Sequence, residues 1–313
     1  MLWSILILLA AVAGIMAYGY RKAFYAPEPR TEDLYQLPPG EQYEQERDRM
    51  LALIREMDAV PYEPVPITAA DGTSLFGRYY HVRDGAPLQL QFHGYRSAGI
   101  KDFCGGNPLA RRAGQNTLVV DQRAHGKSGG TAIAFGVLER YDCLDWLRWA
   151  NERFGADTPI YLSGVSMGAA TVLMAAGLEL PQNVLGIIAD SPYSCPRAII
   201  RKVCGQDMHL PAAIVCPLVE LAGRLFGGFS LSDSSPREAV KQAKVPILII
   251  HGEDDRFVPC DMSREIAENC ASPVRRETFP GAGHGLSYIV GTQRYSRVTA
   301  EFFHFCETNP AEH

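Results

Sequence analysis

The sequence lacks the patterns that mark zinc-binding, redox and nucleic-acid-binding proteins. Its eight cysteines are scattered and form no CxxC pair, so no zinc or redox motif is present. No block of like charge occurs, and a net charge of −5 offers no basic face to a nucleic acid. We therefore expect no metal, no cofactor and no nucleic-acid partner, and we interpret the cysteines as small buried hydrophobic residues.

Charge is also missing from the first twenty residues. The apolar run from Leu2 to Tyr20 is long enough, as a helix, to span the ~30 Å hydrocarbon core of a bilayer. Trp3 and Tyr18 lie near its two ends, where interfacial aromatic side chains are favoured. We predict a transmembrane anchor at residues 1–22 that binds the chain to a membrane. The alternative is a cleaved signal peptide and secretion, but a basic start and a small-residue cleavage site are both missing.

Two features follow the apolar run. Arg21 and Lys22 come directly after it, and by the positive-inside rule they place the rest of the chain on the cytoplasmic side. Residues 23–40 are rich in proline and carboxylates and are interpreted as a linker. A protein that begins near Thr31 is therefore expected to be soluble and active.

The remainder of the chain, residues 41–313, is predicted to form one α/β domain. Runs such as LVV and ILII are apolar throughout, as expected when helices cover both faces of a parallel sheet. Amphipathic segments separate the later runs. The pattern predicts a mostly parallel, eight-stranded sheet flanked by helices, with strands at 65–69, 75–82, 87–92, 117–121, 160–163, 184–189, 245–250 and 275–279.

One connection is longer than the fold requires. About fifty residues separate the strands that end at Ala189 and begin at Val245, against a dozen or more for an ordinary crossover. We predict a helical cap at about 193–236, over the sheet edge where ligands enter α/β proteins. Its apolar residues Leu218 and Phe226 are expected to line an acyl pocket. The alternative is a set of packing helices that do not contact substrate.

The clearest chemical motif is Gly-Val-Ser-Met-Gly at residues 164–168. It follows an apolar strand and precedes a helical run of small residues. A sharp strand-to-helix turn presents such a serine above the sheet, and glycines two positions before and after allow close backbone packing. The motif predicts that Ser166 is a nucleophile.

A serine hydroxyl is a weak nucleophile and needs an adjacent base, which a third group orients. His284 lies in the glycine loop GAGHG after the last strand, where an imidazole can reach over the sheet edge. His93, His125 and His251 begin His-Gly pairs beside strands, and we interpret them as turn or structural residues. We therefore predict His284 as the base.

Three carboxylates are candidates for the orienting acid. Asp254 and Asp255 follow the strand LIIHG, from which either could reach a neighbouring loop and hold the imidazole in its proton-accepting tautomer. Asp190 follows the preceding strand and is a third candidate. The residues alone do not separate these three.

The motifs together resemble those of the α/β-hydrolase superfamily. The resemblance covers about residues 65–305 and includes membrane-tethered α/β-hydrolase-domain proteins and bacterial esterase-like relatives. The order serine, acid, histidine is also the one described for this fold. The matching segments are FHGYRS at 92–97, DQRAHGKSGG at 121–130, GVSMG at 164–168, HGEDDRFVP at 251–259 and GAGHG at 281–285.

The resemblance implies specific roles. In the family pattern HGxxDxxVP the acid is Asp255 rather than Asp254, and the backbone N–H groups of Tyr95 and Met167 form an oxyanion hole. The DQRAHGKS turn has Ala124 where glycine is usual, and we interpret this turn as scaffold.

The expected function is that of a serine hydrolase that cleaves small carboxylic esters through an acyl-serine intermediate. Thioesters, amides and peptides stay open as substrates. A catalytically silent, membrane-tethered binding module is the alternative from another class. Fold alone does not decide among these.

Overall fold

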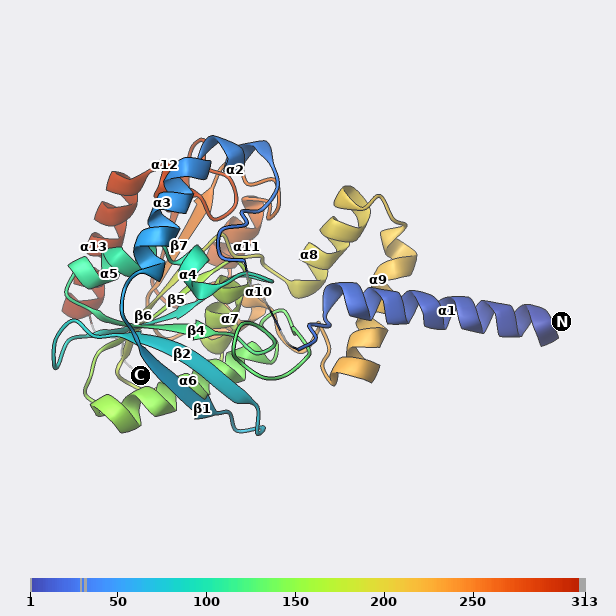
Figure 1. Cartoon of the computed structure of the whole chain (residues 1–313), viewed down its shortest axis with the longest axis horizontal. Helices are drawn as coiled ribbons and strands as arrows, with labels where there is room; N and C mark the ends of the chain where they lie inside the picture. The colour runs from blue at the N-terminus through green and yellow to red at the C-terminus, as the bar shows by residue number, and fades with distance from the viewer. Residues whose placement is uncertain (1, 29, 31–32, 310–313) are drawn as a thin grey trace.

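A computed structural model describes residues 2–28, 30 and 33–309. It contains the expected eight-stranded sheet, in the order β1-β2-β4-β3-β5-β6-β7-β8 (Figure 1). β2 pairs antiparallel with β1 and β4, and all other neighbours are parallel. The strands are β1 (Glu63–Thr68), β2 (Ser74–Tyr80), β3 (Leu88–Phe92), β4 (Asn116–Asp121), β5 (Ile160–Val165), β6 (Val184–Asp190), β7 (Ile247–Gly252) and β8 (Val274–Phe279).

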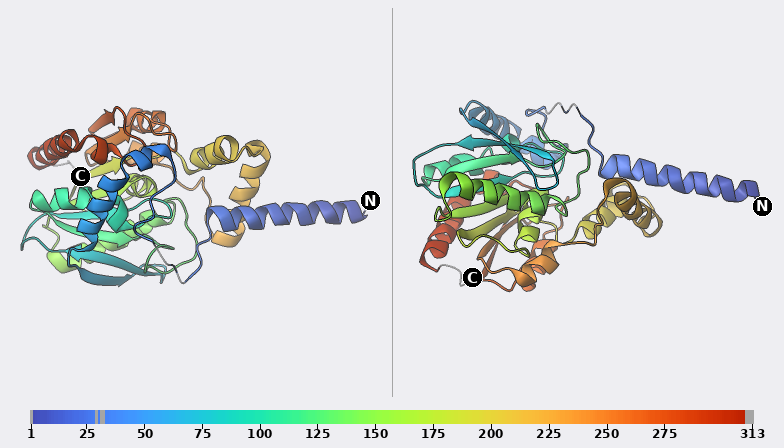
Figure 2. Two further views of the ribbon diagram at one scale, coloured as in Figure 1. Left: turned by 45° about the horizontal axis from the view of Figure 1, so that its top comes forward. Right: turned by 90° about the horizontal axis from the view of Figure 1, so that it is seen from below.

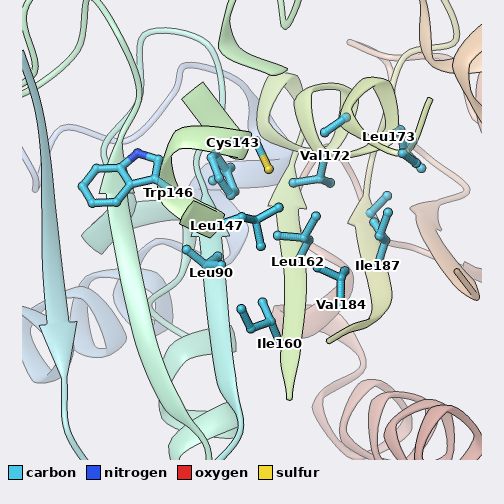
Figure 3. Packing of buried hydrophobic residues seen from close by; sticks show 14 of the residues in the cluster. Leu90, Cys143, Trp146, Leu147, Ile160, Leu162, Val172, Leu173, Val184 and Ile187 are labelled. Carbon is cyan, nitrogen blue, oxygen red and sulfur yellow. The ribbon is translucent and has the colours of Figure 1, made fainter. Parts of the chain in front are cut away.

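Helices cover both faces of this sheet, which explains why the runs LVV in β4 and ILII in β7 are apolar. On one face, Trp146 and Leu147 of one helix and Val172 of another pack against Leu90 and Leu162 of the sheet (Figure 3). The helices of the domain are α2 (Glu41–Gln45), α3 (Arg47–Asp58), α4 (Gly99–Asp102), α5 (Gly106–Arg112), α6 (Glu139–Phe154), α7 (Met167–Ala175), α10 (Pro236–Ala239), α11 (Asp261–Glu268), α12 (Ser287–Val290) and α13 (Thr292–Thr308).

The opposite face of the sheet is covered by α3, α4, α12 and α13. Phe302 of α13 belongs to the same buried cluster as Ile188 and Leu248 of the sheet, and Ile54 of α3 to that of Val119. Full burial of one such side chain stabilises the fold by roughly 1.5–3 kcal/mol.

The predicted strand positions are confirmed to within two residues. β7 begins at Ile247 rather than Val245. Pro246 lies just before the strand and has no N–H to donate to the sheet, which accounts for the later start. The carboxyl ends of the parallel strands meet at one edge of the sheet, where the loops after β3, β5, β6, β7 and β8 come together.

A long helix, α1 (Leu2–Ala23), projects from the domain at the amino end of the chain (Figures 1 and 2). It is long and apolar enough to cross a membrane by length and composition.

The residues that follow α1 are packed on the domain rather than extended into solvent. Phe24 is fully buried, Tyr25 forms an isolated β-bridge with Ala132, and the N–H of Ala26 donates to the carbonyl oxygen of Thr131 at 2.9 Å. The predicted start near Thr31 lies outside the described residues. A protein that begins there lacks Phe24 and Ala26, and we therefore do not expect it to match the full chain in stability.

The long connection between β6 and β7 forms two helices that stand apart from the sheet and lie beside α1 (Figures 1 and 2). They are α8 (Pro196–Lys202), which continues into the π-helical turn η1 (Val203–Asp207), and α9 (Ala212–Ala222), which continues into η2 (Gly223–Gly227). We call residues 196–227 the cap helices.

Candidate active site

Ser166 occupies a sharp turn between β5 and α7. Its backbone has φ +56° and ψ −113°, a conformation that side-chain-bearing residues rarely adopt. A Cβ atom on Gly164 would lie 2.2 Å from the carbonyl oxygen of Gly168, and one on Gly168 would lie 1.9 Å from that of Phe92. Both flanking glycines are therefore required by close backbone contacts, as the motif predicts.

The structure brings the three predicted side chains together. The Nε2 atom of His284 lies 2.9 Å from the Oγ atom of Ser166, and its Nδ1 atom lies 2.6 Å from Oδ2 of Asp255. The side chain of Asp254 is exposed. The carboxyl group of Asp190 accepts a hydrogen bond from Ser191 instead, at 3.0 Å. The geometry thus separates the three carboxylates that sequence reasoning left open.

The carboxyl group of Asp255 is buried and accepts several hydrogen bonds. The N–H groups of Phe257 and Val258 donate to Oδ1 at 2.9 and 2.7 Å, and His251 and His284 both contact Oδ2. Burial alone would raise the pKa of this carboxyl group. The charge of His284 and the histidine hydrogen bonds outweigh burial and hold the pKa well below its usual value. Asp255 is therefore ionised, as an orienting acid must be.

His251 contacts the site, although sequence reasoning treated it as a structural residue. Its Nε2 atom lies 3.2 Å from Oδ2 of Asp255 and 3.0 Å from the carbonyl oxygen of Val258. Both neighbours are acceptors, so Nε2 carries the proton and donates to them. The contact between His251 and Asp255 could have been predicted from their spacing, because the two residues are four positions apart at the end of β7.

The loop after β3 lies beside Ser166, since a Cβ atom on Gly94 would come within 3.3 Å of the Cβ atom of Ser166. Tyr95 is the next residue of this loop. On one side of it the N–H of Gly94 donates to Oδ2 of Asp102 at 2.6 Å, and on the other the N–H of Arg96 donates to Nε2 of His125 at 2.9 Å. Among the described residues, we find no hydrogen-bond acceptor for the N–H of Tyr95 or of Met167, the first residue of α7. These two donors are therefore free to bind a substrate oxygen.

The DQRAHGKS turn holds the loop after β3 through His125. Its Nδ1–H donates to the carbonyl oxygen of Arg123 at 2.9 Å, which leaves Nε2 as the acceptor for Arg96. Burial and the nearby charge of His93 lower the pKa of His125 well below its usual value, so the ring stays neutral and can accept. Ala124 adopts φ +59°, the conformation for which glycine is usual at this position.

A cavity of about 820 Å³ opens beside Ser166 and His284. Its inner walls are mainly apolar, although polar groups of Gln89, Ser163 and Asp190 also reach it, and Tyr43 covers it by donating from its hydroxyl to the carbonyl oxygen of His284 at 3.0 Å. The outer end carries charges of both signs. The apolar inner residues are Leu109, Ile188, Tyr288 and Phe303, and the outer charged residues are Glu41, Lys101, Asp102, Lys202, Asp207, Asp254 and Arg256.

The expectation that Leu218 and Phe226 line this cavity is wrong. The cap helices supply only Lys202 and Asp207 to it. Phe226 is 55% exposed, and its ring lies 5.5 Å from that of Tyr20 in α1. The cap helices turn toward α1, because α9 packs along that helix rather than over the sheet edge.

Among the residues that the structure describes, no group of three or more His, Cys, Asp or Glu side chains is placed to hold a metal ion.

The protonation of Asp190 is expected to make the free energy of unfolding depend on pH. Burial raises its pKa to about 6, although a hydrogen bond from Ser191 and nearby histidines act in the opposite direction. Between about pH 4 and pH 6 the folded state keeps a proton that the unfolded state has lost, so this group makes stability fall as pH rises. We expect Asp190→Asn to stabilise the fold by about 3 kcal/mol above pH 6 and to have little effect near pH 4.

Urea unfolding at pH 4 and pH 7.5 measures this difference. Asp254→Asn is the matched control, because it removes an exposed carboxylate from the same edge of the sheet. A stability change in Asp190→Asn that is equal at both pH values would contradict the assignment of a buried, ionising Asp190.

Comparison with known proteins agrees with this geometry. Residues 91–212 match the family model of the alpha/beta hydrolase fold, and residues 223–286 match that of a serine hydrolase family (FSH1). Lysophosphatidylserine lipase ABHD12 of Rattus norvegicus is 29% identical over 242 residues, which cover 69% of this chain and 55% of the relative. The protein YqkD of Bacillus subtilis is 27% identical over 189 residues, covering 60% and 62%. Each match spans less than two thirds of the relative.

Solved structures share the fold. The esterase Pf2001 of Pyrococcus furiosus superimposes with a TM-score of 0.66 at 20% identity, covering 90% of this chain and 97% of the esterase. Est1E of Butyrivibrio proteoclasticus, with ferulic acid bound, gives a TM-score of 0.58 at 20% identity, covering 80% and 100%. The two partial family matches and the solved structures lead to one conclusion: the chain has the α/β-hydrolase fold and is similar to serine hydrolases that share it.

Proposed function

We propose that this protein hydrolyses carboxylic esters through an acyl-serine intermediate, with Ser166 as nucleophile, His284 as base and Asp255 as acid. The observation that carries the proposal is the continuous hydrogen-bond chain from Asp255 through both ring nitrogens of His284 to Oγ of Ser166. In this arrangement the ionised Asp255 keeps the proton of His284 on Nδ1, which leaves Nε2 free to accept the serine proton.

The proposed reaction has two halves. His284 takes the proton of Ser166 as Oγ attacks the ester carbonyl carbon, and it then gives that proton to the departing alkoxide. In the second half His284 deprotonates a water molecule, which attacks the acyl carbon. His284 then returns this proton to Oγ of Ser166 as the bond to the acyl group breaks, and the acid is released. The N–H groups of Tyr95 and Met167 stabilise the negative oxygen of each tetrahedral intermediate, an effect of roughly 3 kcal/mol per donor.

The cavity supports an ester with an acyl chain rather than an acetyl group. Its volume of about 820 Å³ lies within the range of pockets that bury a whole ligand. Leu109, Ile188 and Phe303 provide apolar walls for the chain, and the charged outer end suits a polar leaving group. The printed name of the relative ABHD12, a lysophosphatidylserine lipase, supports a single-chain lipid ester as the substrate class. The outer charges are mixed, so they do not select one headgroup charge.

We also propose that α1 remains attached as a membrane anchor, with the catalytic domain on the side of Arg21 and Lys22. The packing of its final turns supports this. The Cβ position of Gly19 lies within 2.8 Å of Val219, and Phe24 is fully buried. Cleavage after the apolar run would remove Gly19, and the cap helices would lose the contact between Val219 and α1.

A series of p-nitrophenyl esters, compared with p-nitroanilides of the same acids, tests the function. We expect kcat/KM to increase roughly tenfold for every two carbons from acetyl to about C8, because each buried methylene contributes about 0.8 kcal/mol. The anilides should be poor substrates. Faster cleavage of anilides would favour an amidase or peptidase. No turnover of any ester or thioester, together with no reaction of Ser166 with a fluorophosphonate, would favour a catalytically silent binding module.

A further inference from the structure

The cap helices and the loop between them carry a group of exposed apolar side chains that neither the sheet nor the cavity uses. Their exposures run from 36% to 64%. Exposed apolar residues gathered in this way mark interaction surfaces, whereas single exposed residues are common on any protein. We call this group the cap patch; it comprises Met208, Leu210, Ile214, Leu221, Leu225 and Phe226.

The cap patch lies next to α1. Gly19 of α1 faces Val219 of α9 so closely that a Cβ atom there would lie 2.8 Å from the valine methyl group. The hydroxyl of Tyr20 donates to the carbonyl oxygen of Phe226 at 3.2 Å, and the rings of these two residues are 5.5 Å apart. Both views in Figure 2 show the cap helices flanking the part of α1 nearest the domain. The cap patch and the exposed surface of α1 are therefore continuous.

The length of α1 decides how deep the cap patch lies. Residues 2–15 form the part of α1 that projects from the protein, and none of their described side chains is buried. Met16 is the first buried residue of the helix. Fourteen residues span about 21 Å, which is less than the ~30 Å of a bilayer core. The apolar run can cross the core only if residues 16–20 also enter it. Those are the residues beside α9, so insertion of α1 brings the cap patch to the membrane surface.

Exposed cations lie at the end of α1 and on the cap helices, as expected for a surface that binds lipid headgroups. Arg21 and Lys22 are exposed at the end of α1, and Arg201 is exposed on α8, where its charge acts on Cys216 of α9. Cations that border an apolar surface bind anionic lipid headgroups while the apolar side chains enter the acyl boundary.

We propose that the cap patch is a second membrane-binding surface that lies in the bilayer interface beside α1. The protein would then bind its membrane through a transmembrane helix and an interfacial pair of helices together. Lys202, the last residue of α8, and Asp207, the last residue of η1, line the outer end of the cavity. Tyr95 also lines the cavity and donates from its hydroxyl to the carbonyl oxygen of Ala23, the last residue of α1, at 3.0 Å. The cavity lining is therefore connected to both elements that bind the membrane in this proposal.

Tryptophan quenching by brominated lipids tests this placement in the full chain. Leu225→Trp and Ile214→Trp place a reporter at two independent positions of the cap patch, both more than 60% exposed. Phe305→Trp is the matched control, because Phe305 is 40% exposed on α13, a helix that packs on the sheet in a buried cluster without cap-helix residues. Each variant is reconstituted in phosphatidylcholine–phosphatidylglycerol vesicles with bromine on the acyl chains, and the emission of the wild-type protein is subtracted.

We expect the added emission of both cap variants to be blue-shifted and quenched at least about twofold more than that of Phe305→Trp, as for side chains inserted at the acyl boundary. Equal quenching in cap and control variants would overturn the proposal. Blue-shifted emission without quenching, together with chemical cross-linking of two copies in the vesicles, would show that a second copy covers the cap patch instead. The measurement needs no turnover, so its result is independent of the proposed ester hydrolysis.

Discussion

Replacement of Ser166 by alanine is expected to lower kcat/KM for a p-nitrophenyl ester by about 10⁴-fold or more. The change removes the oxygen that His284 contacts through Nε2. The fold should be unaffected, because alanine is tolerated at a similar positive φ at Ala124, with φ +59°. Ester assays, labelling by a fluorophosphonate and thermal unfolding measure the three consequences.

Ser163→Ala is the matched control for this experiment. Ser163 lies on β5, three residues before Ser166, and it lines the same cavity. It is 7% exposed, as Ser166 is, but it does not contact His284. We expect this variant to keep most of the activity and to react with the fluorophosphonate. If Ser166→Ala kept a tenth of wild-type activity at an unchanged unfolding temperature, Ser166 would not be the nucleophile.

The second large effect is expected at Asp255. Asp255→Asn should lower kcat by about 10⁴-fold, because an amide no longer holds the His284 proton on Nδ1 and the wrong tautomer faces Ser166. Asp254→Asn should change kcat by less than about threefold, since an exposed charge outside the hydrogen-bond chain contributes little to it. The backbone N–H of Asp254 still donates to the carbonyl oxygen of Ala282 in either variant, at 3.0 Å.

Steady-state kinetics of the two variants on one ester, with urea unfolding in parallel, separates chemistry from folding. The amide side chain introduced by Asp255→Asn retains an oxygen that can accept from the N–H groups of Phe257 and Val258, so the loop should stay in place. Equal and mild losses in both variants would refute Asp255 as the acid.

Much of this site was predictable because its chemistry depends on local sequence. The turn at Ser166 needs glycine at 164 and 168, since backbone atoms lie within about 2 Å of any Cβ placed there. A requirement of this kind depends on residues adjacent in the chain, so it appears as a motif. The apolar strands and the position of His284 after the last strand are local in the same sense.

Other features depend on which segments meet in space. Asp254, Asp255 and Asp190 all lie at the same sheet edge, and only the folded loops show that Asp255 alone reaches His284. The role of His125 depends on a contact with Arg96, 29 residues away, which no local pattern contains.

The sequence by itself thus determined the sheet, the nucleophile turn and the apolar helix at the amino end, because periodicity and close backbone contacts are recorded in neighbouring residues. The direction of the cap helices was decided only by tertiary structure. The apolar residues of α9 could equally have covered the cavity, and the composition of that segment is the same in both cases. The cap helices point away from the cavity because Val219 packs against Gly19 and Phe226 packs against Tyr20. These two contacts join segments about two hundred residues apart.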